Sequence, residues 1–213
     1  MSADAQQGSL FIVIEGLDGA GGTTQCRLLQ SWLERRGSTV VSTNEPTELP
    51  VGKFIRDILQ DPHSNVGDEV LAYLFAADRQ DHLDSRVKPA LSRGEVVISD
   101  RYYHSSLAYQ SLSLEFDFVA QLNRTFPVPD LTIFLLLEPE TSFSRVQDRG
   151  LPVERFETLD RLRSISQSYS RVIRYCQDRG DALVCLDATQ SIEEIHEQIC
   201  EEITKLIHTK TAD

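Results

Sequence analysis

The sequence predicts an α/β protein whose sheet is mostly parallel, and two observations support this fold class. Short apolar segments alternate with segments in which apolar residues recur every three or four positions. The apolar segments are rich in Val, Ile, Leu and Phe, as is typical of parallel strands buried on both faces. The chain has 213 residues, 40% of them hydrophobic, so we expect one domain over residues 1–213 with a single core.

The strands and the clearest helices follow from this alternation. The predicted helices lie at 158–176, with an apolar face from Leu159 to Cys176, and at 192–207, begun by Ser191 with Glu193 and Glu194 in the first turn. No repeat, low-complexity segment or linker divides the chain. The predicted strands are residues 10–15, 39–43, 95–99, 131–137 and 182–186.

A glycine-rich loop lies between the first strand and a helix carrying Leu28, Leu29 and Leu33. This context aims backbone N–H groups and the positive end of the helix at one anion. Gly16 and Gly21 fit the G-x-x-x-x-G spacing of a phosphate-binding loop, and Thr23 stands where a hydroxyl would reach Mg²⁺. Position 22, where such loops carry lysine, is glycine. Without its lysine the motif is also compatible with an ordinary glycine-rich turn.

Six further segments occur in order along the chain: 45–47 (EPT), 52–56 (GKFIR), 74–79 (LFAADR), 99–110 (SDRYYHSSLAYQ), 129–131 (PDL) and 149–157 (RGLPVERFE). Together with 14–25 (IEGLDGAGGTTQ), they resemble thymidylate kinases, the P-loop enzymes that phosphorylate dTMP with ATP. The resemblance implies a P-loop NTPase-type three-layer sandwich, with a parallel five-stranded sheet and a small mobile lid at about 145–157. It also implies Mg²⁺ as the cofactor, dTDP and ADP as the products, and a homodimer, for which the helix with Leu71, Leu74 and Phe75 offers an apolar face.

The same resemblance assigns roles to particular residues. Arg101 would contact the phosphates in catalysis, Arg56 would hold the dTMP phosphate, and Asp18 would bind the sugar 3′-hydroxyl beside the reaction. Thr23 and Asp100 would be the metal ligands, with Mg²⁺ also held by phosphates and water. The ATP-binding loop would comprise Gly16, Leu17, Asp18, Gly19, Ala20, Gly21, Gly22, Thr23 and Thr24. The acceptor site would comprise Asp18, Glu45, Arg56, Phe75 stacked on thymine, Arg79 at the base edge, Arg101, Ser105, Tyr109 and Gln110.

Several of these residues also permit a plainer interpretation. Phe75 could be a core phenylalanine, Asp100 and Arg101 a surface ion pair, and Asp18 a turn residue. Glu45 could be a solvated residue before a proline. Ser105, Tyr109 and Gln110 could belong to a loop followed by the start of a helix.

Position 19 is glycine, which resembles the family members that place a catalytic arginine in the lid. Arg149 and Arg155 are the candidates, and Arg145 is a third, less favoured one. Such an arginine contributes roughly 10³–10⁵ to the rate of related phosphoryl transfers. The alternative is that residues 147–156 form only a charged loop between helices.

Glycine at position 22 leaves three interpretations: a kinase that works without the lysine, a catalytically impaired nucleotide-binding or regulatory protein, and a sequence error. We favour the first, because the other phosphate-handling positions are filled. A deoxynucleoside kinase acting on thymidine is a further alternative. Arg56 argues against it, because a nucleoside has no phosphate to hold.

The net charge of 21 − 33 = −12 argues against a nucleic-acid polymer as partner. No apolar run approaches the ~20 residues of a membrane helix, and the polar residues 1–8 do not resemble a signal peptide, so a cytoplasmic location is expected. We expect a flexible leader at 1–9 and a tail at 209–213. Four cysteines without a CxxC pair are expected to be reduced core residues.

Overall fold

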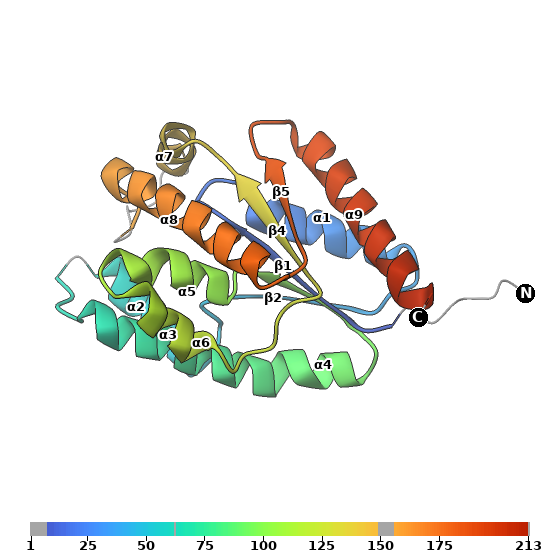
Figure 1. The fold of residues 1–213 in the computed structure, drawn as a ribbon, viewed down its shortest axis with the longest axis horizontal. Helices are drawn as coiled ribbons and strands as arrows, with labels where there is room; N and C mark the ends of the chain where they lie inside the picture. The colour runs from blue at the N-terminus through green and yellow to red at the C-terminus, as the bar shows by residue number, and fades with distance from the viewer. Residues whose placement is uncertain (1–7, 62, 149–155, 213) are drawn as a thin grey trace, which may run out of the picture.

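The computed structural model describes residues 8–61, 63–148 and 156–212. Within them, five parallel strands form one sheet in the order β2-β3-β1-β4-β5 (Figure 1). This arrangement confirms the predicted α/β class and the parallel sheet. The strands are β1 (Leu10–Gly16), β2 (Val40–Asn44), β3 (Val96–Asp100), β4 (Leu131–Leu136) and β5 (Leu183–Asp187).

The strand ends differ by one residue from those predicted. β2, β3 and β5 each begin and end one residue later, β1 continues through Gly16, and β4 ends at Leu136. The cause is pairing between strands: Asn44 is aligned with Asp100, and Gly16 with Leu135. Polar residues and glycine are therefore included in the ladders at their carboxyl ends, where hydrophobicity alone predicts that a strand stops.

Helices cover both faces of the sheet and complete a three-layer sandwich (Figure 1). On one face lie α1 (Gly22–Glu34) and α9 (Ile192–Ala212). On the other lie α4 (Lys88–Ser92), α5 (Tyr103–Tyr109) and α8 (Leu159–Asp178). The remaining helices are α2 (Pro50–Gln60), α3 (Asp68–His82), the π-helical η1 (Leu83–Val87), the 3₁₀ turn η2 (Gln110–Leu112), α6 (Phe116–Asn123) and α7 (Pro139–Gln147).

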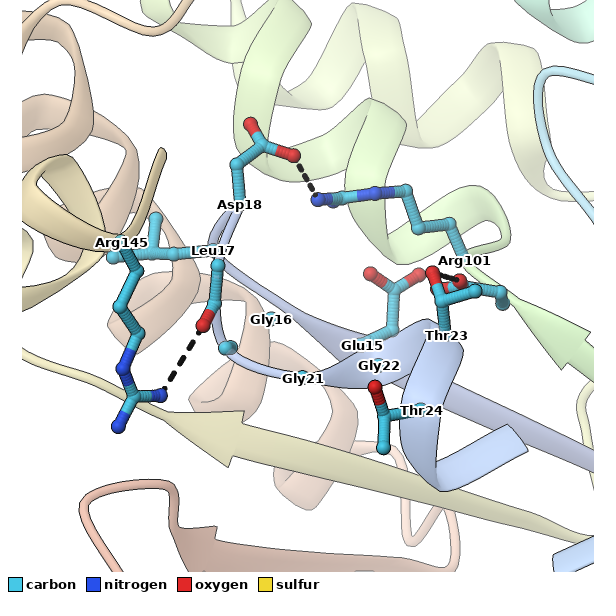
Figure 2. A pocket seen from close by; sticks show the side chains of 13 residues that line it. Glu15, Gly16, Leu17, Asp18, Gly21, Gly22, Thr23, Thr24, Arg101 and Arg145 are labelled. Atoms are coloured by element: carbon cyan, nitrogen blue, oxygen red, sulfur yellow. Dashed lines mark hydrogen bonds and ion pairs between the residues drawn. The ribbon is translucent and has the colours of Figure 1, made fainter. Parts of the chain in front are cut away.

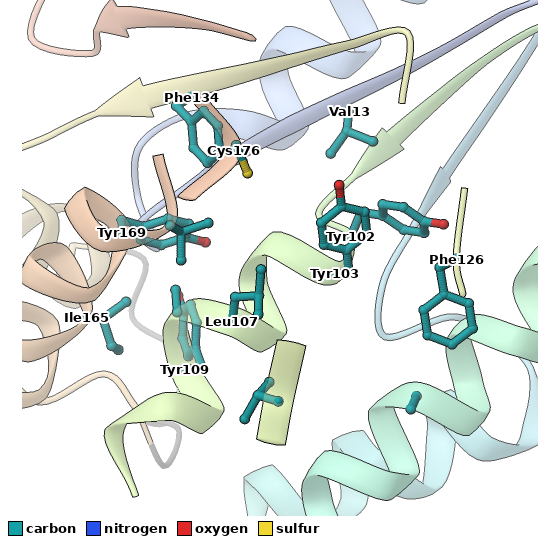
Figure 3. Packing of buried hydrophobic residues seen from close by; sticks show 14 of the residues in the cluster. Val13, Tyr102, Tyr103, Leu107, Tyr109, Phe126, Phe134, Ile165, Tyr169 and Cys176 are labelled. Atoms are coloured by element: carbon teal, nitrogen blue, oxygen red, sulfur yellow. The ribbon is translucent and has the colours of Figure 1, made fainter. Parts of the chain in front are cut away.

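Alternate residues of β1 build the two halves of the core. Ile12 and Ile14 pack toward α1 and α9, whereas Phe11 and Val13 pack toward α5 and α8. In the second half, tyrosines supply much of the packing, and Tyr109 of α5 meets Tyr169 of α8 edge to face (Figure 3). The predicted apolar stripe of 158–176 is confirmed, because its main positions are buried in this cluster: Leu162, Ile165, Tyr169, Val172 and Cys176.

Two local predictions have different outcomes. Ser191 begins α9 as expected: its Oγ accepts a hydrogen bond from Glu194 N, and Glu194 Oε2 accepts one from Ser191 N. All four cysteines are free, but only Cys26 and Cys176 are buried, so the core assignment is wrong for Cys185, which is exposed on the edge strand β5. Among the described residues, no helix combines the length and the apolarity needed to cross a bilayer.

Candidate active site

The loop between β1 and α1 forms the floor of a cavity of about 410 Å³ (Figure 2). Gly21 precedes α1 with a φ of +99°, a conformation that glycine adopts readily. A Cβ at Gly16 would lie 2.7 Å from the carbonyl oxygen of Leu135, so only glycine lets the loop pass this close to β4. These two positions explain the glycine spacing seen in the sequence.

Asp100, the last residue of β3, faces the start of α1. Thr23 Oγ1 donates a hydrogen bond to Asp100 Oδ2 over 2.5 Å. A Cβ at position 22 would lie 2.9 Å from Asp100 Oδ1, so the carboxylate occupies the space beside Gly22. Hydroxyl and carboxylate oxygens are the donors that Mg²⁺ prefers. Across the described residues no group of three or more His, Cys, Asp or Glu side chains could hold a metal by itself.

Arg101 follows β3 in the left-handed region, with a φ of +72°. Its Nη2 donates to Asp18 Oδ1 over 2.7 Å, and its Nη1 donates to Ser105 Oγ over 3.1 Å. A non-glycine residue in this region is strained, and the surrounding contacts hold it there. The alternative of a surface ion pair between Asp100 and Arg101 is therefore wrong, because Asp100 pairs with Thr23 of α1 and Arg101 pairs with Asp18 in the loop between β1 and α1.

Beneath Arg101 lies the buried carboxylate of Glu15, a residue of β1 that was not predicted to belong to the site. It accepts hydrogen bonds from Tyr102 N at 2.8 Å, Ser105 Oγ at 2.7 Å and Tyr169 OH at 2.9 Å. Burial raises the pKa of Glu15, although Arg101 and these donors act in the opposite direction. The sequence signal for Glu15 was a glutamate inside an apolar strand, directly before a glycine-rich loop. Tyr169 carried no such signal, because it fits the apolar stripe of its helix.

A second cavity of about 120 Å³ shares Asp18 and Arg101 with the first. Tyr109 OH donates to Asp18 Oδ2 over 3.2 Å, and Phe156 packs edge to face on Tyr109. Phe75 is partly buried in this wall, so the core-phenylalanine interpretation is wrong. Further lining residues are Glu45, Pro46, Leu59, Arg79, Tyr102, Ser105, Ser106, Gln110 and Glu157. The side-chain oxygen of Gln110 is buried without a hydrogen-bond partner among the described residues.

Arg79 reaches the second cavity from α3 and is almost completely buried. Its Nε and Nη2 lie 2.9 and 2.7 Å from Glu45 Oε2. Nη1 donates to Asn123 Oδ1 over 2.5 Å, and Nη2 to Ser106 Oγ over 3.1 Å. Glu45 is only 5% exposed, so the interpretation as a solvated residue is wrong. Asn123 lies outside every predicted motif, and Ser106 lies within the segment 99–110 but was not predicted as a site residue.

Arg56 lies in a third cavity, of about 450 Å³, which it shares with Glu45, Asp100 and Arg101. It donates to the carbonyl oxygen of Thr47 over 2.6 Å and forms an ion pair of 2.8 Å with Glu48. The structure thus places Arg56 beside the second cavity rather than inside it. Arg101 lines all three cavities.

Of the three candidate lid arginines, Arg145 belongs to the described chain. It lies on α7, on the opposite side of the loop from Arg101, where its Nη1 donates to the carbonyl oxygens of Gly19 and Ala188, both at 3.2 Å (Figure 2). Arg149 and Arg155 lie outside the described residues.

Comparison with known proteins agrees with this geometry. A family model described as thymidylate kinase matches residues 14–199. The chain is 37% identical over 206 residues to a probable thymidylate kinase of Thermococcus kodakarensis, covering 93% of this chain and 98% of that protein. It is 40% identical over 194 residues to one of Pyrococcus horikoshii, covering 89% and 93%. It is also 40% identical over 163 residues to a thymidylate kinase of Xanthomonas oryzae, covering 76% and 71%.

The family match extends over most of the chain, and within it lie the glycine loop, the carboxyl ends of β1 and β3, and the residues that line the cavities. The fold, the site and the comparisons therefore agree that this chain belongs to the thymidylate kinase family.

Proposed function

We propose that this protein transfers the γ-phosphoryl group of ATP to dTMP, giving ADP and dTDP. The observation that carries the proposal is the position of Arg101, which lines the phosphate-loop cavity, the second cavity and the cavity of Arg56. Phosphoryl transfer joins two anionic ligands, so the enzyme must stabilise charge where they meet. Arg101 supplies a permanent positive charge at that place.

The phosphate loop is the ATP side of the site. The backbone N–H groups of residues 16–24 bind the phosphates of ATP, aided by the positive end of α1. Thr23 and Asp100 are the residues that would hold Mg²⁺, together with oxygens from ATP and water, because the described protein ligands are too few to hold it alone. When bound, Mg²⁺ would supply positive charge to the phosphates of ATP.

The second cavity receives the nucleoside part of dTMP. Phe75 offers an aromatic face for the thymine ring, and Arg79 and Gln110 offer polar atoms for its edge. Tyr109 and Asp18 lie at the sugar, and Asp18 binds the 3′-hydroxyl. The dTMP phosphate extends toward Arg56 and Arg101, which share the adjoining cavity.

Ser105 and Glu45 act behind this surface. The Ser105 hydroxyl donates to Glu15 and accepts a hydrogen bond from Arg101, so it orients the arginine rather than the sugar. Glu45 fixes Arg79 in the same way.

We further propose that the reaction proceeds without a lysine at position 22. Gly22 still offers its backbone N–H, and with no side chain it would let water or an arginine from residues 145–157 approach the phosphate. Arg149 and Arg155 supply the charge that the lysine would have provided, and this segment closes over the bound ligands.

An ADP-release assay with Mg²⁺-ATP and a panel of nucleoside monophosphates tests the proposal, with thymidine as an additional acceptor. We expect turnover with dTMP and little with the other bases. Turnover of thymidine instead would favour a deoxynucleoside kinase. Binding of both nucleotides without any turnover would favour the regulatory nucleotide-binding protein.

We also propose that the protein forms a homodimer and is located in the cytoplasm. α3 does not present Leu71 to a partner, because Leu71 is 1% exposed within the subunit and Phe75 faces the second cavity. The large apolar side chains that α2 and α3 expose are Phe54, Val70 and Tyr73. We therefore assign the dimer contact to these exposed apolar side chains.

A further inference from the structure

Two side chains of α3 hold the carboxylate of Glu45, one at each oxygen. Arg79 binds Oε2, and His82 Nδ1 lies 3.0 Å from Oε1. All three side chains are buried, with 3% exposure or less. A buried carboxylate with both oxygens engaged has one stable orientation, because rotation would leave a charge without partners.

His82 is itself fixed through its second ring nitrogen. Its Nε2 lies 2.8 Å from Thr43 Oγ1, at the end of β2. A carboxylate can only accept, so Nδ1–H donates to Glu45, and in the neutral ring Nε2 accepts the hydroxyl hydrogen of Thr43. The imidazole thus lies between β2 and Glu45 and contacts Glu45 through Nδ1.

The orientation of Glu45 matters because it sets the direction of the one N–H group of Arg79 that forms no hydrogen bond within the described chain. A guanidinium has five N–H groups, and the contacts to Glu45, Asn123 and Ser106 engage four of them within the described chain. Arg79 also lines the second cavity, whereas His82 is not among the residues lining it. One N–H therefore stays available for a ligand, in a direction set by Glu45.

We infer that His82 is a positioning residue for nucleobase recognition, acting on Arg79 through Glu45. The inference rests on the proposed function, because it assumes that a pyrimidine base occupies the second cavity. If His82 only stabilised the fold, loss of the contact at either ring nitrogen would have the same effect on dTMP binding. If His82 positions Arg79, dTMP binding should depend on the Nδ1 contact, which reaches Arg79 through Glu45. It should not depend on the Nε2 contact, which reaches Thr43 of β2.

Two substitutions at His82 separate the effect of the Nδ1 contact from that of the Nε2 contact. His82→Asn places an amide near the position of Nδ1 and keeps the contact to Glu45, whereas His82→Gln places it near Nε2 and keeps the contact to Thr43. Thr43→Val is the matched control, because it removes the Nε2 contact and leaves His82 in place. Each of the three loses one buried hydrogen bond, so we expect similar decreases in Tm.

The readout is steady-state kinetics with dTMP and ATP, together with calorimetric binding of dTMP without ATP. We expect His82→Gln to raise KM and Kd for dTMP about tenfold, the loss of one hydrogen bond to a charged group, with kcat and KM for ATP nearly unchanged. His82→Asn and Thr43→Val should stay near wild type. Equal increases in all three variants, or no increase in any, would overturn the inference.

A second variant covers the case in which His82→Gln does not fold. Glu45→Gln keeps the shape of the carboxylate while weakening its contacts to both His82 and Arg79, so KM for dTMP should rise at constant kcat. An unchanged KM there would overturn the inference. A wild type that binds no dTMP overturns the proposed function and this inference together, whereas normal dTMP binding with unchanged variants overturns the inference alone.

Discussion

Arg101 Nη2 lies 2.7 Å from Asp18 Oδ1, which joins the residue after β3 to the loop after β1. The second carboxylate oxygen of Asp18 accepts a hydrogen bond from Tyr109. Both side chains of the ion pair are partly exposed, at 21% and 25%, so ligands can reach them. The pair forms the wall common to the two cavities, and it holds the arginine in place.

The first prediction concerns this arginine. Arg101→Gly should lower kcat about 10³-fold, because it removes a positive charge from the place where the phosphates meet. Stability should fall little, because glycine suits the φ of +72°. The measurements are steady-state kinetics and thermal unfolding. Arg93→Ala is the control: it also removes an arginine with a carboxylate partner, but Arg93 is exposed and pairs with Glu95 away from the cavities. A similar loss of kcat in both variants would count against the role of Arg101.

The second prediction addresses the missing lysine. Gly22→Lys should fold, because its Cβ meets only the movable carboxylate of Asp100, at 2.9 Å. In a kinase that works without the lysine, the added side chain should change kcat less than about tenfold, since it supplies a charge already present. Both proteins are assayed with Mg²⁺-ATP and dTMP. An inactive wild type that gains activity in Gly22→Lys would instead identify an impaired enzyme.

The third prediction concerns residues 149–155. Arg149→Ala or Arg155→Ala should lower kcat far more than it raises KM for dTMP, because an arginine that acts in the transition state contributes mainly to kcat. Arg145→Ala is the comparison, since Arg145 binds carbonyl oxygens of Gly19 and Ala188 in the structure. Unchanged kcat in both Arg149→Ala and Arg155→Ala would remove the lid-arginine assignment.

The fourth prediction concerns pH and stability. Burial, followed by the charges of Arg79 and Arg179, lowers the pKa of His104 from 6.5 to about 3. Below pH 6.5 the unfolded chain binds a proton at His104 that the folded protein does not bind until about pH 3. The free energy of unfolding should therefore decrease as pH falls, by about 2 kcal/mol at pH 5.

Urea unfolding at pH 5, 6 and 7 measures this decrease in the wild type and in His104→Phe. Phenylalanine keeps the ring that stacks on Tyr103 but has no titrating nitrogen. The difference between the two proteins isolates the histidine from other titrating groups. Parallel pH profiles would show that His104 is not responsible.

The fifth prediction concerns assembly. Val70→Glu replaces one of the exposed apolar side chains of α3 with a charge, whereas Val128→Glu changes another exposed valine, which lies between α6 and β4. A homodimer formed through the exposed apolar side chains of α2 and α3 should dissociate in the first variant and persist in the second. Analytical ultracentrifugation distinguishes the outcomes, and a wild type that is monomeric would refute the dimer itself.

The buried polar groups show most clearly what could not be predicted. Glu15, His82 and Asn123 lie in segments that look like ordinary strand or helix, because pattern analysis reads only the spacing of apolar residues. Their partners are distant in sequence: Glu15 meets Tyr169, and Arg79 meets Asn123. Such contacts depend on how helices cross the sheet, which no local pattern encodes.

What the sequence determined by itself was the α/β class, the five strands of the parallel sheet to within one residue at each end, and the glycine spacing of the loop after β1. Hydrophobic period and glycine spacing are local properties, so a linear chain displays them. Only the tertiary structure decided that Asp100 faces Thr23, that Arg101 pairs with Asp18, and that one arginine lines three cavities. These relations arise because the parallel order β3-β1-β4 brings the carboxyl ends of distant strands to one edge, where their side chains compete for the same partners.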